Sequence, residues 1–217
     1  MRYLTFALAK GRLAEEAMEL LNRVGISCEE MKEKSRKLIF VNEELKYKFF
    51  LSKTDDVPTY VEYGAADIGV CGKDTLLEKR RNLYEVLDLN FGNCQMIVAG
   101  LAGNSTLLKN GNNFRVATKY PALAADYFRQ RKQTVEIVKL NGSVELAPIV
   151  SLADFIVDIT QTGETIKANG LEIMDEIMPL SARLVVNRAS IKMEHTRITE
   201  LVSKLKTAMG AEKLADN

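Results

Sequence analysis

The sequence has few of the residues from which proteins build metal centres and disulfide frameworks. Its three cysteines, Cys28, Cys71 and Cys94, are widely separated, and His195 is its single histidine. A zinc site needs closely spaced ligands, and a disulfide framework usually has an even number of cysteines. We therefore expect reduced, mostly buried cysteines, no metal held by the protein alone, and an exposed His195 in a charged C-terminal helix.

The sequence also lacks an excess of one charge and any long apolar run. Lysine and arginine number 30 against 29 aspartates and glutamates, for a net charge of +1. This balance gives no general attraction for nucleic acid or an anionic membrane. Neither the ~20 apolar residues of a membrane span nor a signal-peptide cleavage pattern is found. We expect a cytoplasmic protein with no nucleic-acid or membrane partner.

Several catalytic signatures are missing as well. The sequence shows no nucleophile elbow, metal-binding histidine pair, dinucleotide glycine fingerprint or Walker lysine loop. It therefore offers no activated nucleophile, and any chemistry must depend on binding and orienting its substrates.

Strand-like and helix-like segments alternate along the chain. Expected strands are residues 3–9, 37–41, 47–51, 67–71, 94–101, 114–117, 135–140, 155–159 and 182–187, and expected helices begin near residues 12, 56, 73, 121, 143, 164 and 190. This alternation predicts an α/β protein with mostly parallel sheets. Residues 102–113, rich in Gly, Asn and Ser, are expected to form a flexible loop.

The two halves of the chain echo each other. Residues 60–72 and 144–165 each predict a helix, a strand and the start of another helix, with Ala66-Asp67 and Ala153-Asp154 at matching positions. This predicts two similar lobes whose facing helix N-termini form a ligand cleft. Chance similarity of two such units is the alternative.

The stretch from Asp158 to Ile166 carries the strongest functional signal. It predicts the end of a buried strand, a Thr-Gly turn and a helix from Glu164 to Asn169 that stops at Gly170. Backbone N–H groups, hydroxyls and a helix N-terminus would converge there, as a phosphate requires. Asp158 and Gln161 lie where sugar hydroxyls or a phosphate-bound metal would be. Alternatively, Thr162 or Thr165 only caps the helix.

Other strand-to-helix junctions carry charged residues. Cations at Lys10-Gly11-Arg12 oppose the helix dipole and so indicate a bound anion, or else are solvated. Arg36 alone is more typical of a surface residue. Asp56 is best explained as a helix cap. Lys73 either meets an anion or faces water, Thr118 and Lys119 either cap or bind phosphate, and Glu145 either caps or binds ligand.

Taken together, the junctions resemble those of the short form of ATP phosphoribosyltransferase. The resemblance rests on Leu8-Ala-Lys-Gly-Arg, Lys139-Leu-Asn-Gly-Ser-Val-Glu-Leu-Ala-Pro and Val157-Asp-Ile-Thr-Gln-Thr-Gly, and on residues 35–40, 56–62, 64–70, 116–121 and 181–187. The blocks occur in the family's order and span nearly the whole chain.

The resemblance implies a two-lobed α/β fold like that of type II periplasmic binding proteins, with the active site in the cleft. Lobe I would comprise residues 1–88 and 180–217, and lobe II residues 89–179. The implied reaction condenses ATP with 5-phosphoribosyl 1-pyrophosphate, releases pyrophosphate, needs substrate-bound Mg²⁺ and opens histidine biosynthesis. By motif, the phosphoribosyl group would be bound by Asp158, Gln161, Thr162, Gly163, Glu164, Thr165 and Glu145. ATP or pyrophosphate would be bound by Lys10, Gly11, Asp56 and Lys73. The catalytic residues would be Arg12 and Arg36.

The chain departs from the family's pattern at two positions. Many family members have an acidic residue where this chain has Gln161, and many have proline where it has Ala9. The chain ends soon after its last expected helix, so we expect no C-terminal regulatory domain.

The short form is expected to pair with a regulatory subunit related to histidyl-tRNA synthetase. A non-catalytic ligand-binding module, or a phosphoribosyltransferase acting on another base, is the competing prediction.

Overall fold

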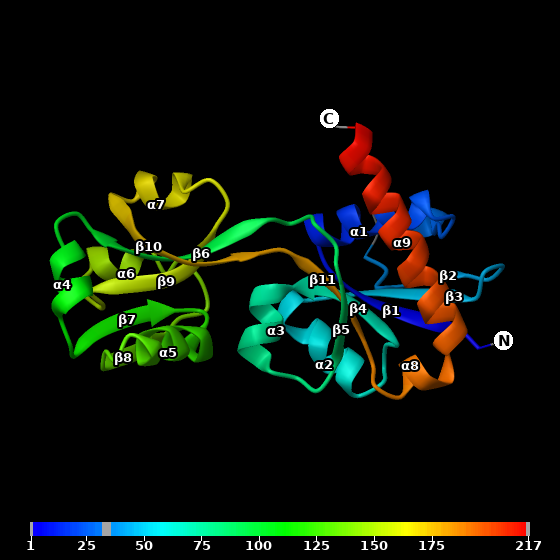
Figure 1. Cartoon of the computed structure of the whole chain (residues 1–217), viewed down its shortest axis with the longest axis horizontal. Coiled ribbons are helices and arrows are strands. Elements are labelled where there is room, and N and C mark those ends of the chain that lie inside the picture. The colour runs from blue at the N-terminus through cyan, green and yellow to red at the C-terminus, as the bar shows by residue number, and fades with distance from the viewer. Residues whose placement is uncertain (1, 32–35, 216–217) are drawn as a thin grey trace. The chain divides into compact units, whose positions relative to one another are not determined.

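The computed structural model describes residues 2–31 and 36–215, and the chain divides into two units. Unit 1 comprises Met1–Gly92 and Ser181–Asn217, and unit 2 comprises Asn93–Leu180. The two boundaries fall four residues and one residue later than those expected from the sequence. Figure 1 labels the elements of each unit.

Unit 1 contains a six-stranded mixed sheet with strand order β2-β3-β1-β4-β11-β5. Its strands are β1 (Leu4–Ala9), β2 (Ile39–Asn42), β3 (Tyr47–Ser52), β4 (Ile68–Gly72), β5 (Tyr84–Asp88) and β11 (Ala182–Val186). Strand β1 is parallel to β3 and to β4, and the other neighbours are antiparallel. The hairpin expected within residues 37–51 is confirmed as β2 and β3, whereas a mostly parallel sheet is wrong.

Helices cover both faces of this sheet, so strand β1 is buried on both of its sides. Leu4, Phe6 and Leu8 pack on one face with residues of α1 (Arg12–Arg23) and α9 (His195–Ala215). Ala7 and Ala9 pack on the other face with α2 (Val57–Glu62) and α3 (Lys73–Lys79) (Figure 1). This follows from the alternation of side chains along a strand. The unit is completed by η1 (Glu29–Met31), η2 (Thr54–Asp56) and α8 (Ser190–Met193).

Unit 2 contains a five-stranded mixed sheet with strand order β10-β6-β9-β7-β8. Its elements are β6 (Cys94–Leu101), α4 (Ser105–Asn110), β7 (Phe114–Thr118), α5 (Pro121–Gln130), β8 (Val135–Lys139), α6 (Leu146–Ile149), β9 (Phe155–Thr160), α7 (Glu164–Ala168) and β10 (Leu171–Leu180). Strand β7 is parallel to β8 and β9, whereas β6 is antiparallel to β9 and β10. Phe114 meets Phe128 of α5 and Phe155 of β9 edge to face, at centroid distances of 5.5 and 5.0 Å.

Several expected elements differ in the structure. Residues 102–113, predicted as a flexible loop, contain α4, and the single helix predicted from residue 190 is α8 followed by α9. The strands β5 and β10 were not predicted. By contrast, Cys28 and Cys71 are buried as expected, burial raises the pKa of both thiols, and His195 is exposed.

The predicted match between Asp67 and Asp154 is confirmed in detail. The N–H of Asp67 donates to the Thr5 carbonyl at 2.9 Å, and its Oδ2 accepts from the Thr5 N–H at 2.8 Å. Asp154 makes the same two bonds to Arg115, at 2.9 and 2.8 Å. Each aspartate thus holds the start of its own strand against the neighbouring parallel strand.

Candidate functional site

In unit 1, the parallel strands place three lysines at one edge of the sheet. Lys10 follows β1, Lys53 follows β3 and Lys73 follows β4. The register pairs Ala9 with Ser52, and the Lys10 N–H donates to the Ser52 carbonyl at 2.9 Å. Ligands of α/β sheets commonly bind outside the carboxyl ends of parallel strands. Lys53 was not singled out from the sequence; its signal is a cation directly after a strand, as at Lys10.

Gly11 and Arg12 open helix α1 beside this edge. Gly11 has φ +90°, which disfavours any side chain although an added Cβ would meet nothing within 4 Å. The Arg12 side chain is 55% exposed, and its Nε lies 3.3 Å from Oε1 of Glu16. The guanidinium is therefore both accessible and held by a carboxylate one turn along the helix.

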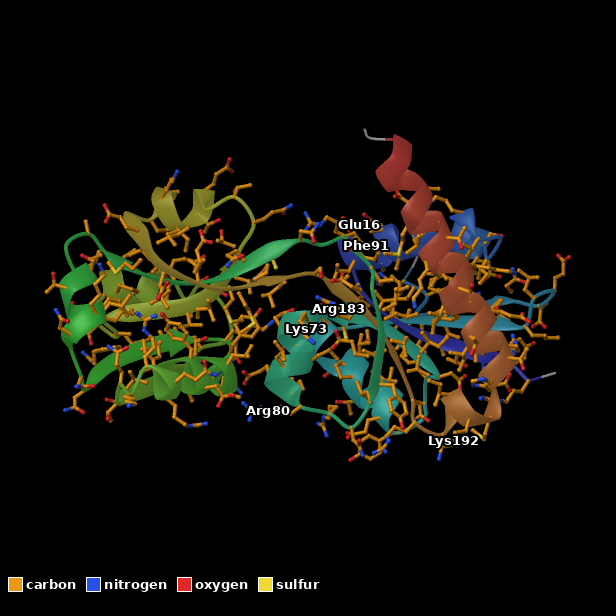
Figure 2. All side chains as sticks on the ribbon, viewed as in Figure 1. Glu16, Lys73, Arg80, Phe91, Arg183 and Lys192 are labelled. Carbon is orange, nitrogen blue, oxygen red and sulfur yellow. The ribbon has the colours of Figure 1, made fainter. Side chains whose placement is uncertain are left out.

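Lys73 belongs to a network of charged residues at the same end of the sheet. Its ammonium pairs with Glu85, which also lies 3.4 Å from Arg183, and Arg183 pairs with Asp88 at 2.8 Å. Figure 2 labels Lys73 and Arg183 in this region. The sequence predicted that Lys73 either meets an anion or faces water, and neither alternative included this ion pair with Glu85.

Arg36 and Asp56 approach this edge from neighbouring segments. The Leu51 N–H donates to the Leu38 carbonyl at 2.9 Å, which brings exposed Arg36, two residues earlier, near the end of β3. Ser35, its neighbour in the family block, lies outside the described residues. Asp56 precedes α2 but makes no capping hydrogen bond, so its predicted role as a helix cap is wrong.

In unit 2, the turn after β9 has a left-handed glycine at its centre. Gly163, with φ +76°, is the N-cap of α7, and no side chain makes the capping bond. Oγ1 of Thr160 accepts from the Gly163 N–H at 2.9 Å, and Oγ1 of Thr162 accepts from the Glu164 N–H at 3.4 Å. The predicted capping role is thus wrong for Thr165. For Thr162, the only support for that role is this long hydrogen bond.

The other groups predicted around that turn lie on the same strand and turn. Asp158 is half-buried, and its Oδ1 accepts from the Ile159 N–H at 2.8 Å. Gln161, Thr162, Glu164 and Thr165 are exposed. A five-residue helix leaves its first N–H groups without intrahelical acceptors, so the turn presents donors beside exposed hydroxyls.

Glu145 and Thr118 lie toward the same edge of this sheet: Thr118 is the last residue of β7, and Glu145 follows β8 directly before α6. Helix α6 begins after Glu145, which makes no capping bond, and Ser143 has φ +47°. The helix expected to begin near residue 143 therefore starts at Leu146, and the capping alternative for Glu145 is wrong. Thr118 is fully buried, donating to the Val157 carbonyl at 2.6 Å and accepting from the Tyr120 N–H at 2.8 Å. Thr118 therefore has a structural role instead of a phosphate contact.

Within the ranges that the structure describes, no three or more His, Cys, Asp or Glu side chains gather as metal ligands would. No helix in those ranges is both long and apolar enough to cross a membrane.

The chain is similar to known proteins along most of its length. Residues 53–207 match the family model described as HisG: ATP phosphoribosyltransferase. An ATP phosphoribosyltransferase of Lachnoclostridium phytofermentans is 63% identical, covering 96% of this chain and 98% of the relative.

Solved structures agree. A chain of the ATP phosphoribosyl transferase (HisG:HisZ) complex from Thermotoga maritima is 36% identical, with a TM-score of 0.82 over 96% of this chain and 99% of that chain. The BvgS VFT2 domain of Bordetella pertussis, 15% identical with a TM-score of 0.60 over 99% of this chain and 91% of that chain, shares the fold alone. The expected two-lobed α/β fold class is confirmed, and the chain belongs to the ATP phosphoribosyltransferase family.

Proposed function

We propose that this chain condenses ATP with 5-phosphoribosyl 1-pyrophosphate to phosphoribosyl-ATP and pyrophosphate, the first step of histidine biosynthesis. The observation that carries the proposal is the 63% identity to an ATP phosphoribosyltransferase over 96% of the chain. An adenine ring nitrogen forms a bond to the anomeric carbon while the bond from that carbon to the pyrophosphate oxygen breaks. Such a step needs two oriented substrates and stabilisation of the leaving charge.

The phosphoribosyl group binds at the turn after β9 in unit 2. The turn from Thr162 to Thr165 supplies backbone donors and two exposed hydroxyls to the 5-phosphate. Asp158 and Gln161 meet the ribose, and Glu145 faces the phosphoribosyl group from the start of α6. Gln161 is neutral, so the contact there is a hydrogen bond without charge.

ATP and pyrophosphate bind the cationic edge of unit 1. Lys10, Gly11 and Lys73, with Asp56, contact the nucleotide and the pyrophosphate. Arg12 and Arg36 stabilise the departing pyrophosphate, because a guanidinium binds two phosphate oxygens with forked donors. Lys53 lies beside Lys10 and adds to the same positive edge.

Mg²⁺ would be brought by the phosphoribosyl pyrophosphate substrate and would neutralise part of its charge. Mg²⁺ keeps several waters and typically takes one or two protein carboxylates beside phosphate oxygens. The half-buried carboxylate of Asp158 fits such a single contact.

The chain works in the cytoplasm with a second subunit. The Thermotoga maritima relative was solved as a HisG:HisZ complex, and this chain matches it over nearly its whole length. We place a HisZ-type subunit, related to histidyl-tRNA synthetase, as its regulatory partner.

Thermal unfolding with magnesium phosphoribosyl pyrophosphate tests the site. Ligand at 100 times its dissociation constant should stabilise wild type by ~2.7 kcal/mol, and Thr165→Ala should reduce that shift. Thr106→Ala is the matched control, since Thr106 is exposed and is likewise the second residue of its helix, α4. An equal reduction in both variants, or equal weakening of ATP binding by Thr165→Ala, would contradict the assignment.

Activity with alternative acceptors tests the reaction itself. In the presence of the HisZ-type subunit, we expect phosphoribosyl transfer to ATP, measured as the release of pyrophosphate. Transfer to a different base would make the chain another phosphoribosyltransferase, and ligand binding without turnover would make it a binding module.

A further inference from the structure

The carboxylate of Glu16 joins the first turns of α1 to the point where the chain leaves unit 1. Its Oε1 lies 3.3 Å from Nε of Arg12, and its Oε2 accepts from the Gly92 N–H at 3.1 Å. Gly92 is the last residue of unit 1 before unit 2 begins. One side chain, only 29% exposed, therefore contacts both Arg12 and the connecting backbone.

The backbone around Gly92 is itself tightly fixed. Gly92 has φ +62°, and a Cβ added there would lie 2.6 Å from Cδ2 of Leu13. The Phe91 carbonyl accepts from the Ala182 N–H at 2.9 Å, which ties the same segment to β11. Figure 2 shows the labelled Glu16 and Phe91 together beside α1. Glu16 is thus anchored to a segment that cannot easily move.

We infer that Glu16 is a positioning residue for the transfer reaction, holding the Arg12 guanidinium in the orientation that receives the departing pyrophosphate. This inference rests on the proposed role of Arg12. The contact engages Nε and so directs the plane of the guanidinium. A guanidinium that is already held in one orientation loses less conformational freedom when it binds the pyrophosphate, which favours the transfer step.

Glu16→Gln separates this role from simple anchoring. The glutamine keeps the side-chain length and an oxygen that can accept from the Gly92 N–H, but it no longer offers a charge to Arg12. We expect kcat to fall about 10-fold, with the KM for ATP nearly unchanged and thermal stability close to wild type. Glu15→Gln is the matched control, since Glu15 is the exposed neighbour on the same helix turn and should keep the wild-type kcat. Equal losses in both variants, or no loss in Glu16→Gln, would overturn the inference.

A double-mutant cycle with Arg12→Ala provides the second test. If Glu16 acts through Arg12, Glu16→Gln should change kcat little in the Arg12→Ala background. The same 10-fold fall in both backgrounds would refute coupling. Normal kcat for Arg12→Ala would remove both the role of Arg12 and this inference, whereas an impaired Arg12→Ala beside a normal Glu16→Gln would remove the inference alone.

Discussion

Replacing Asp67 by alanine should destabilise unit 1 strongly. The Asp67 side chain is 5% exposed and accepts hydrogen bonds from the Arg2 guanidinium, the Thr5 N–H and the Ser190 hydroxyl. It therefore links the N-terminal strand, the start of β4 and the start of α8. These segments are far apart in the sequence, so no local interaction replaces the carboxylate.

The magnitude follows from what each donor loses. Ser190 is 3% exposed, and its hydroxyl and the Thr5 N–H would each lose a buried acceptor, at about 1–3 kcal/mol. Arg2 is 44% exposed, so water would largely replace its ion pair, which is worth about 0–1 kcal/mol at a surface. Summed over the three donors, Asp67→Ala should cost about 2–7 kcal/mol.

Urea unfolding followed by circular dichroism measures this cost, since the chain has no tryptophan. Asp154→Ala is the control, because Asp154 makes the same backbone bonds to Arg115. Among the residues that the structure describes, Asp154 makes no bond to a buried hydroxyl, so this variant should cost about 1 kcal/mol. Equal losses for the two variants would show that the buried network around Asp67 contributes nothing beyond the shared backbone bonds.

Three further predictions concern catalysis, packing and pH. Arg36→Ala should lower kcat at least ~10-fold, or ~1.4 kcal/mol, and normal steady-state kinetics would remove Arg36 from the site. Gly69→Ala should destabilise the fold by about 1–3 kcal/mol in urea unfolding, because its Cβ would lie 2.7 Å from Cγ2 of Val61; unchanged stability would contradict this packing. The pKa of Tyr127 is raised, mainly because the phenol is buried and secondly because it donates a hydrogen bond to Asp175. The folded state therefore favours the neutral phenol. Its contribution to the free energy of unfolding is complete below the unfolded-state pKa of about 10 and is lost progressively as the pH rises above that value. Unfolding midpoints should therefore fall more steeply at alkaline pH in wild type than in Tyr127→Phe, and parallel curves would refute the burial argument.

The sequence predicted the buried strands better than the edge strands. Strand β6 matches residues 94–101, because its apolar run reflects burial between two neighbours. Strand β10 was missed because it is an edge strand with exposed acidic residues and two register shifts against β6, features typical of protected edges. Strand β5 is likewise at an edge and mostly unburied. Strand direction was also wrong, since no local pattern distinguishes the antiparallel neighbours β4 and β11.

The positions of the candidate site residues were predictable where they follow a strand directly. Lys10, Lys73 and the turn at Gly163 all stand at strand-to-helix junctions, which are visible in the sequence. Lys53 and Glu16 were missed because their neighbours come from elsewhere in the chain: Lys53 stands beside Lys10 only through the register of β1 and β3, and Glu16 meets Gly92 across 76 residues.

The place of β11 in unit 1 affects how the protein is made. This strand lies between β4 and β5, although it is formed by residues 182–186. During synthesis, the ribosome releases all of unit 2 before the strand that joins β4 to β5. Unit 2 can therefore fold on the nascent chain, whereas unit 1 must wait with an incomplete sheet until translation is nearly finished. A premature stop after unit 2 would leave that sheet without an interior strand.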